Sequence, residues 1–142
     1  MIKNSEFIDK LRFSGLRPTK QRLKICEVLF NREKTFHFTI NDLARNISEQ
    51  LNEKISLATV YNTVHAFKDK GYLKEISINS DKSYFDTNIG DHHHFFDEDT
   101  NELIDCNNDD IEKIKIKNNI TAKKIKSIEV LIKVASDNQN QK

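Results

Sequence analysis

The break at Gly15-Leu16-Arg17-Pro18-Thr19 constrains the fold most, because it divides the N-terminal region into short helices. Glycine readily takes the left-handed conformation that ends many helices, which predicts a first helix over roughly residues 3–14. Proline and threonine favour a helix start, so a second helix is predicted from Pro18 and Thr19 to about Asn31. The chain is therefore expected to begin with two short helices joined by a tight turn.

Two further helices are predicted downstream. Thr39 caps the third, and Asp42, three residues on, comes close to a capping box. The fourth runs from an N-cap at Ser56 to Lys70, where Gly71 ends it. Its apolar face is Leu57, Val60, Val64 and Phe67, with Tyr61 at the edge. Its opposite face is small and polar, with Ala58, Thr59, Asn62, Thr63 and Ala66.

The small outward face of the helix over residues 56–70 lacks the long glutamates and lysines of an ordinary solvated helix. Small side chains let a helix approach a surface closely, as a helix entering the major groove of DNA must. Residues 73–78 and 82–86, on either side of Asn79-Ser80-Asp81, read as a β-hairpin. Helices followed by a hairpin describe a winged helix-turn-helix, although an ordinary helical domain with a hairpin fits the patterns about equally well.

Three of the five histidines are consecutive, at His92, His93 and His94. In an extended strand, His92 and His94 project to one face and His93 to the other. The surrounding carboxylates are Asp86, Asp91, Asp97, Asp99 and Asp105. Because imidazole and carboxylate together suit a borderline divalent metal, a metal or metallocofactor site is the default interpretation. A solvated histidine-rich turn is the alternative.

The net charge of +1 hides an uneven distribution. Residues 1–76 hold 14 Lys/Arg and 9 Asp/Glu, whereas residues 77–142 hold 9 and 13. A basic first half suits a polyanion and an acidic second half suits cations.

No apolar run approaches the ~20 residues that cross a bilayer, the N-terminus does not resemble a signal peptide, and Cys26 and Cys106 form no CxxC pair. A cytoplasmic protein without a membrane partner is expected.

Three motifs make the chain recognisable: residues 15–22 (GLRPTKQR), 56–63 (SLATVYNT) and 84–96 (YFDTN followed by DHHHFF). Together they closely resemble the ferric uptake regulator superfamily over about residues 5–135, and most of all its haem-responsive iron response regulator branch. The resemblance implies an α+β homodimer. It places a winged helix-turn-helix DNA-binding domain at residues 1–85 and a small α/β dimerisation and sensing domain at 86–142, with a disordered tail from about residue 136.

The resemblance also implies the roles of individual residues. Tyr61 is the implied base contact on a recognition helix, and Arg17 and Arg22 match positions that touch DNA. The expected DNA-binding set is Arg17, Arg22, Ser56, Ala58, Thr59, Tyr61 and Asn62. Many relatives carry arginine at Asn62, so a different base preference is expected. His37, Asp86, His92, His94 and Asp105 match an interdomain metal site, with Fe²⁺, Zn²⁺ or Mn²⁺ as the expected ion.

Two other family sites are incomplete in this sequence. Asp91, His93 and Glu112 match a second site that relatives complete with a later histidine, and none follows His94. His93 remains available as an axial haem ligand. Most relatives carry a structural Cys₄ zinc site, but Asp97 and Thr100 occupy its first two positions, so no such zinc is expected. The cysteine-proline haem motif is absent, because the sole proline is Pro18.

The second half predicts fewer elements. Leu103-Ile104 suggests a strand, and residues 109–119 a weak helix with Ile111 and Ile114 inward. Ile128, Val130, Ile132 and Val134 alternate with Ser127, Glu129, Leu131 and Lys133, which predicts a half-buried strand. Burial of such a strand in a two-fold sheet would make the dimer self-complementary.

The leading hypothesis is a DNA-binding regulator, mainly a repressor, of iron and haem homeostasis genes. Its expected partners are promoter DNA, a second copy of the chain and a haem-delivering protein. The alternatives are a zinc- or manganese-responsive repressor, a metal-independent repressor, and a metal-free interaction module. A metalloenzyme is disfavoured because the chain has three glycines, few loops to build a pocket, and no nucleophile elbow or phosphate loop.

Overall fold

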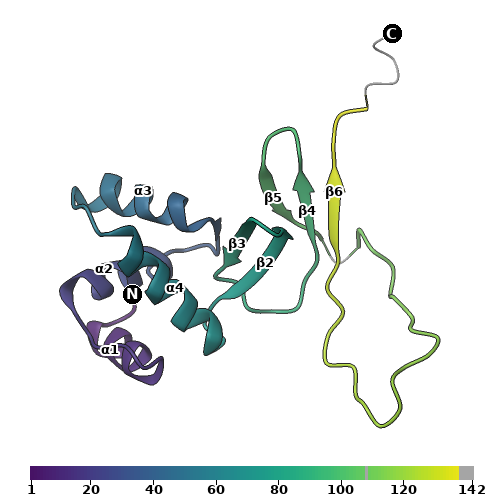
Figure 1. Cartoon of the computed structure of the whole chain (residues 1–142), viewed down its shortest axis with the longest axis horizontal. Helices are drawn as coiled ribbons and strands as arrows, with labels where there is room; N and C mark the ends of the chain where they lie inside the picture. Colours follow the sequence, from purple (N-terminus) through teal and green to yellow (C-terminus); the bar gives the residue numbers. More distant parts are fainter. Residues whose placement is uncertain (108, 138–142) are drawn as a thin grey trace. The chain divides into compact units, whose positions relative to one another are not determined.

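The computed structural model describes residues 1–107 and 109–137 (Figure 1). The chain divides into two compact units, Met1–Ile89 and Gly90–Lys142. The first unit holds all the helices of the described residues and one three-stranded sheet, and the second unit holds another three-stranded sheet. The expected mixture of helix and strand is confirmed. None of the described helices has the length and apolar character of a membrane span.

The helices of the first unit are α1 (Asn4–Phe13), α2 (Lys20–Phe30), α3 (Ile40–Leu51) and α4 (Leu57–Asp69). Their starts follow the predicted caps, because the side chains of Thr19 and Ser56 accept backbone N–H groups of α2 and α4. At α3, Thr39 N–H donates to Asp42 Oδ2 and Asp42 N–H donates to Thr39 Oγ1, both at 3.1 Å. This reciprocal pair is a complete capping box.

Glycines end α1 and α4 as predicted. Gly15 and Gly71 have φ values of +77° and +81°, in the left-handed region that other residues rarely adopt. After α1, the Leu16 N–H donates to the Leu11 carbonyl and the Gly15 N–H to the Arg12 carbonyl, both at 2.9 Å. This pair of hydrogen bonds is a Schellman motif, which satisfies carbonyls that the end of the helix leaves without partners.

The sheet of the first unit has the order β1-β3-β2, with β1 (His37–Phe38), β2 (Lys74–Asn79) and β3 (Lys82–Asp86). β2 and β3 form the predicted antiparallel hairpin. The sequence gives no signal for β1, because two residues are too few to show an alternation. β1 pairs antiparallel with β3, so that His37 lies opposite Asp86 and Phe38 opposite Phe85.

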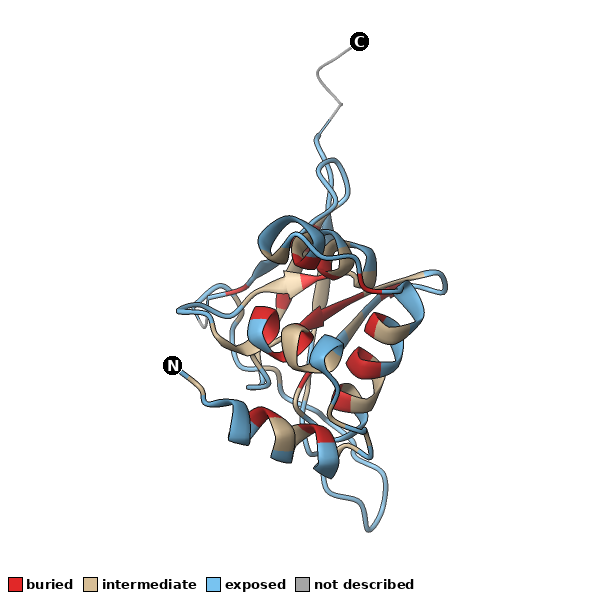
Figure 2. Ribbon diagram, turned by 90° about the vertical axis from the view of Figure 1, so that its left-hand side faces the viewer, coloured by how far each residue is buried: buried red, intermediate tan, exposed pale blue. Residues whose placement is uncertain are grey.

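The core of the first unit gathers apolar residues from all four helices and from the sheet. Leu43 and Ile47 of α3 are fully buried, and so is Cys26 within α2. Figure 2 shows such buried positions in red along the helices and strands. The buried core consists of Phe7, Leu11, Ile25, Cys26, Val28, Leu29, Phe38, Leu43, Ile47, Ile55, Val60, Val64, Phe67, Leu73 and Phe85.

Two positions of α4 differ from the prediction. Leu57, expected on the apolar face, is 52% exposed. It is the first residue of α4 and precedes the helical turn that packs against the core. Thr63, expected on the outward face, is fully buried. It stands three residues after Val60 and four before Phe67, so it shares their face of the helix. Its hydroxyl donates to the Thr59 carbonyl at 2.7 Å, which satisfies the buried oxygen.

The second unit has the strand order β5-β4-β6, with β4 (His94–Asp97), β5 (Glu102–Asp105) and β6 (Leu131–Val134). β4 and β5 form an antiparallel hairpin that contains the predicted strand at Leu103-Ile104. β6 is parallel to β4, with Leu131 opposite His94. The turn between β4 and β5 is closed by Asp97, whose Oδ1 accepts the N–H groups of Asp99 and Thr100 at 2.9 and 3.3 Å.

In the second unit one prediction is wrong, that of the helix, and another, the last strand, is confirmed over only part of its length. Residues 109–119 form no helix, and Ile111 and Ile114 are only half-buried. A short helix draws most of its stability from packing of its apolar face, and this segment is rich in lysine and β-branched isoleucine. The last strand covers only residues 131–134, and Val134 is 38% exposed. Its shortness follows from β4, which offers four residues for pairing.

The tail was expected to be disordered from about residue 136, but Ser136 is attached to the β4–β5 turn. Its N–H donates to Asp99 Oδ2 at 2.6 Å, and its hydroxyl donates to the same oxygen. Residues 138–142, the rest of the expected tail, lie outside the described residues.

The Asp99–Ser136 contact predicts a pH-dependent attachment of the chain after β6. The hydrogen bonds from Ser136 lower the pKa of Asp99. Because the folded-state pKa is depressed, the stabilisation is complete above the ordinary pKa of an aspartate and is lost as the pH falls through the folded-state value. NMR titration of the Asp99 carboxyl should give a midpoint below the ordinary value of about 3.9. Ser136→Ala should raise this midpoint part of the way back, because it removes the hydroxyl but keeps the backbone N–H that also donates to Asp99. A Ser136→Ala variant with an unchanged midpoint would contradict the contact.

Candidate functional site

The first candidate ligand pair is His37 with Asp86, which the β1–β3 pairing holds side by side. His37 Nε2 lies 3.1 Å from Asp86 Oδ2, and the Asp86 side chain is completely buried while that of His37 is 16% exposed. Asp86 Oδ1 accepts the N–H of Asn88 at 2.8 Å. A buried carboxylate is costly without such partners, and the pair offers an imidazole nitrogen and a carboxylate, donor types that suit a borderline divalent metal.

The second candidate group is His92 and His94 with Asp105, all in the second unit. Asp105 Oδ1 lies 3.0 Å from His92 Nε2 and 3.2 Å from His94 Nε2, and the two imidazole rings are 4.3 Å apart between centroids. The β4–β5 register puts His94 directly opposite Asp105. His92 Nδ1 lies 2.7 Å from the Gly90 carbonyl oxygen, a contact that selects the tautomer with its proton on Nδ1. Nε2 is then the nitrogen suited to ligate a metal.

His93 turns away from its two neighbours, as the alternation of an extended segment predicts. Its Nδ1 accepts the N–H of Val130 at 2.8 Å, and its carbonyl accepts the N–H of Cys106 at 2.9 Å. His93 therefore joins the start of β4 to the residue before β6. The histidine triplet thus supplies side chains to two separate environments within the second unit.

Asp91, His93 and Glu112, the expected second site, line one hollow of about 270 Å³. Among the described residues, no set of ligand atoms close enough to share an ion includes these three. Lys113 lines the same hollow and brings a positive charge. The three residues therefore line the same hollow, but their ligand atoms are not close enough together to bind a single ion.

Neither cysteine behaves as a thiolate. Burial raises the pKa of the Cys26 thiol to about 12. Burial also raises the pKa of the Cys106 thiol, and the charges of Asp110 and Asp105 add to that effect. Both shifts favour the neutral thiol over the thiolate, which is the form that binds metal or attacks disulfides.

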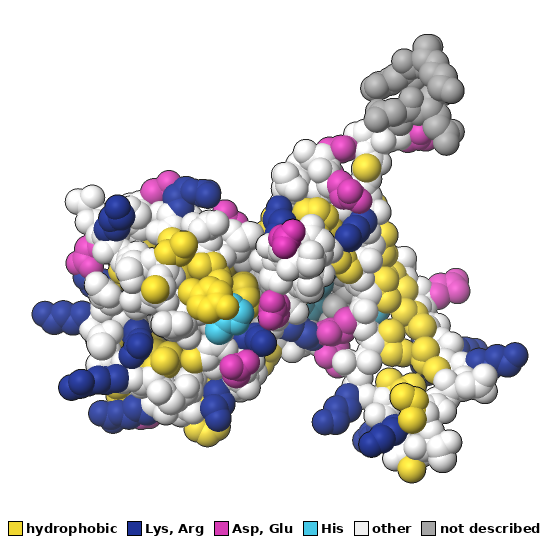
Figure 3. All heavy atoms as spheres, in the orientation of Figure 1, with side chains coloured by type: hydrophobic (Ala, Val, Ile, Leu, Met, Phe, Trp, Pro, Cys, Tyr) yellow, Lys and Arg dark blue, Asp and Glu magenta, His cyan; other side chains and the backbone are white. Residues whose placement is uncertain are grey.

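The exposed face of α4 carries the side chains expected to meet DNA. Tyr61 is 51% exposed, and Ala58 and Asn62 are exposed beside it, whereas Thr59 is half-buried. The Ser56 hydroxyl caps the helix and lies 2.8 Å from the Thr59 hydroxyl. Lys and Arg side chains are spread over the visible face of the first unit (Figure 3).

The two arginines expected to touch DNA are linked to each other. Arg22 Nη1 donates to the backbone carbonyl of Arg17 at 2.8 Å, across the break between α1 and α2. Arg17 is exposed and Arg22 is half-buried. The Arg22 guanidinium is thus held near the surface at the start of α2.

Sequence reasoning missed His65, which packs against Tyr61 with ring centroids 4.2 Å apart. The four-residue spacing on one helix was the available signal, because such residues are neighbours on the helix surface. His65 is also 5.4 Å from the ring of Phe85 in β3.

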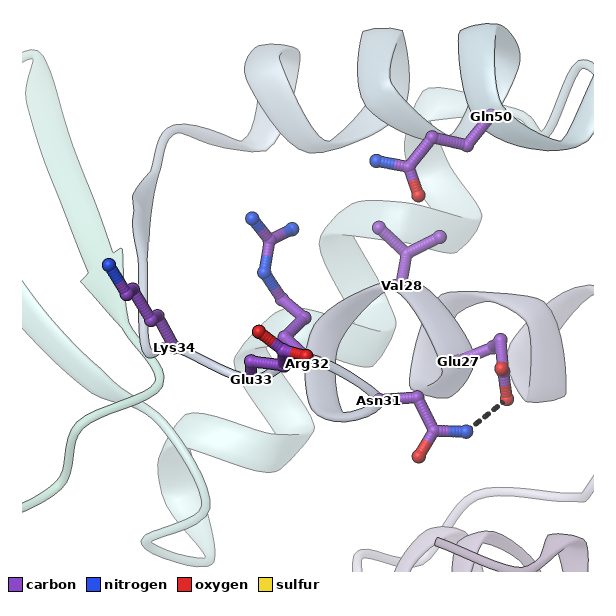
Figure 4. Close-up of a pocket in the computed structure, with 7 residues that line it drawn as sticks. All are labelled: Glu27, Val28, Asn31, Arg32, Glu33, Lys34 and Gln50. Atoms are coloured by element: carbon purple, nitrogen blue, oxygen red, sulfur yellow. Dashed lines mark hydrogen bonds between the residues drawn. The ribbon is translucent and has the colours of Figure 1, made fainter. Parts of the chain in front are cut away.

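A separate hollow of about 440 Å³ lies beside the end of α2 (Figure 4). Its polar residues are of mixed charge, and they include Glu27, Arg32 and Lys34. The Asn31 amide donates to the Glu27 carboxylate at 2.7 Å and accepts the N–H of Ile2 at 2.8 Å. These groups hold the N-terminus against α2 and do not converge on one point.

Comparison with known proteins places the chain in one family. The family model described as "Ferric uptake regulator family" matches residues 13–135. The ferric uptake regulation protein of Pseudomonas fluorescens is 34% identical over 118 residues, which cover 82% of this chain and 91% of that protein. The peroxide-responsive repressor PerR of Staphylococcus epidermidis is 31% identical over 110 residues, covering 78% and 71%.

A solved structure agrees with these matches. The crystal structure of the Vibrio cholerae ferric uptake regulator is similar to this chain with a TM-score of 0.66 and 26% sequence identity. The match covers 91% of this chain and 98% of that one. The chain therefore belongs to the ferric uptake regulator family, whose members are transcription regulators and not enzymes.

Proposed function

We propose that the protein is a homodimeric, metal-responsive regulator, mainly a repressor, that binds promoter DNA in the cytoplasm. The observation that carries the proposal is the arrangement of imidazole and carboxylate groups in the ligand residues, His37 with Asp86, and His92 and His94 with Asp105. Membership of the ferric uptake regulator family supports the same assignment.

One divalent cation bound by His37, Asp86, His92, His94 and Asp105 is the proposed effector. Three imidazoles and two carboxylates favour Fe²⁺, Mn²⁺ or Zn²⁺ over magnesium or calcium. In each group the carboxylate already faces an imidazole nitrogen, so the ligands need little reorganisation to accept a cation. The ion would also offset the negative charge of the two carboxylates.

The ligands divide between the two compact units, which suggests how the ion acts. His37 and Asp86 belong to the unit Met1–Ile89, and the other three ligands to the unit from Gly90 onward. An ion that needs ligands from both units favours the arrangement in which they meet, and so biases a conformational equilibrium. We propose that this bias sets the affinity for DNA.

The DNA-binding part of the proposal is a winged helix-turn-helix at residues 1–85 with α4 as its recognition helix and the β2–β3 hairpin as its wing. Tyr61 and Asn62 are the proposed base-facing residues, supported by their exposure on α4. Ser56, Ala58 and Thr59 belong to the same contact surface. Arg17 and Arg22 are proposed to bind phosphates, since guanidinium groups suit that role.

The second unit, from about residue 86, is the proposed dimerisation and sensing domain. A haem response, as in the iron response regulator branch, is the second candidate for the effector. It rests on His93, which lines a hollow, and it requires the imidazole to give up the hydrogen bond from the Val130 N–H, because that bond occupies Nδ1 and leaves the ring proton on Nε2. If haem is the effector, a haem-delivering protein is a further proposed partner. A zinc- or manganese-responsive repressor and a metal-independent one remain the alternatives.

Tyr61→Ala tests the recognition helix. The variant should lose roughly 1–3 kcal/mol of specific DNA binding, the scale of a lost base contact. Its dimer mass should stay unchanged, because Tyr61 is exposed on the first unit. Fluorescence anisotropy with a DNA fragment selected by the protein, and with random DNA, measures the loss. Equal losses on both DNAs would remove the base-contact role from Tyr61.

Arg17→Ala and Arg22→Ala are the matched comparison. Each should weaken binding to all sequences and reduce the salt dependence by about one ion, because a phosphate contact releases a counterion. A loss confined to the selected fragment would assign these arginines to base readout instead.

His92→Ala, His93→Ala and His94→Ala test the ligand set. The first and third should abolish tight binding of Mn²⁺ or Zn²⁺ in calorimetry, because both rings face Asp105. His93→Ala should keep that site, since its ring faces Val130 instead. Loss of the site in His93→Ala together with its retention in His92→Ala would show that the segment wraps around one ion.

Haem titration of the same three variants distinguishes a haem effector from a divalent-metal effector. If haem is the effector, its absorption spectrum with the wild-type protein should change on His93→Ala and DNA affinity should respond to haem. If His93→Ala leaves the haem absorption spectrum unchanged, and DNA affinity responds only to divalent metal, His93 is excluded as a haem ligand.

A further inference from the structure

His65 in α4 packs between an exposed aromatic ring and a buried one. On one side, the Tyr61 ring lies one helical turn earlier, with centroids 4.2 Å apart and an interplanar angle of 41°. On the other side, the Phe85 ring meets His65 edge-on, at 5.4 Å and 83°. His65 is itself half-buried. It therefore connects the surface of α4 with the sheet below it.

The inner end of this stack is firmly held. Phe85 is 2% exposed and stacks on Phe38, which is fully buried, at 5.9 Å and 26°. The two phenylalanines are opposite each other in the β1–β3 pairing. Close packing on both sides restricts the Phe85 ring, so it gives His65 a fixed surface to rest on.

The outer end of the stack is exposed to solvent. Tyr61 is 51% exposed, and an exposed side chain samples several rotamers unless a neighbour restricts it. Ordering a side chain on binding costs free energy and so lowers the affinity of the complex. A side chain that is already held in its bound conformation avoids this cost. The contact with His65 is therefore placed to select the orientation of Tyr61 before DNA arrives.

We propose that His65 is a positioning residue for sequence recognition, which holds the Tyr61 ring in its DNA-binding orientation by stacking it against the Phe85 anchor. The inference rests on the proposed function, in which Tyr61 contacts a base. His65 acts through Tyr61 and need not touch DNA itself. Its neighbour on the inner side, Phe85, directly precedes Asp86, so the strand that carries a proposed metal ligand also anchors the recognition residue.

The experiment is a double-mutant cycle on the full chain, with Tyr61→Ala, His65→Ala and the double variant. An aromatic pair is worth about 0.5–1.5 kcal/mol beyond its burial, which corresponds to a roughly 2- to 12-fold change in affinity. His65→Ala should weaken binding to the selected DNA fragment by that factor and leave random DNA binding unchanged. The double variant should bind no more weakly than Tyr61→Ala alone, because His65 acts only through Tyr61.

His65→Phe and His65→Gln are the matched controls. Phenylalanine keeps a ring at this position and should restore most of the specific affinity, whereas glutamine, which keeps the helix but has no ring, should not. NMR of the free proteins gives a readout independent of DNA. The Tyr61 ring protons should show a ring-current shift in the wild type and in His65→Phe, and lose it in His65→Gln and His65→Ala.

The outcomes separate this inference from the proposed function. If Tyr61→Ala loses specific binding while neither His65→Ala nor His65→Gln does, or if the losses of the two sites add, the positioning role is overturned and the recognition helix stands. If Tyr61→Ala leaves specific binding unchanged, both fail. Should His65→Ala prove unstable in a melting experiment, His65→Gln and the Tyr61 ring-current shift decide the question.

Discussion

The pairing of β1 with β3 is the interaction on which the first unit most depends. It sets His37 opposite Asp86, whose buried carboxylate lies against His37 Nε2 at Oδ2 and accepts the Asn88 N–H at Oδ1. A carboxylate without such partners would be costly at complete burial. The same two-residue strand places Phe38 on Phe85, which forms the base of the stack that reaches the exposed Tyr61 on α4. One short ladder thus organises a proposed metal-binding pair and the support of a proposed recognition residue.

The second unit holds its histidines by different means. The β4–β5 hairpin sets His94 opposite Asp105, and a backbone carbonyl orients His92, so two imidazoles meet one carboxylate. At Asp97, this chain has a turn closed by the carboxylate of that residue and tied to the chain after β6 through Asp99. Hydrogen bonds to carboxylates therefore connect the strands at that end of the sheet.

The sequence could predict the elements whose signals are local. Thr39, Asp42, Gly15 and Gly71 specify helix ends through their own hydrogen bonds and backbone conformations, and the observed ends follow them. The opposite orientations of His92 and His93 follow from the two-residue period of an extended chain. Features that depend on distant contacts could not be predicted. β1 is too short to show a pattern, the burial of Thr63 depends on what α4 packs against, and the segment 109–119 lacks the packing that a short helix requires.

We propose that one divalent ion, bound by His37, Asp86, His92, His94 and Asp105, sets the affinity for DNA. The most direct test is the DNA association constant measured in buffers of fixed Mn²⁺ or Zn²⁺ activity, because linkage makes the slope of its logarithm against the logarithm of metal activity equal to the number of ions taken up or released on binding. The slope should be non-zero for the wild-type protein and should fall to zero in Asp86→Asn. A slope of zero in the wild type, or one that Asp86→Asn leaves unchanged, would contradict the proposal.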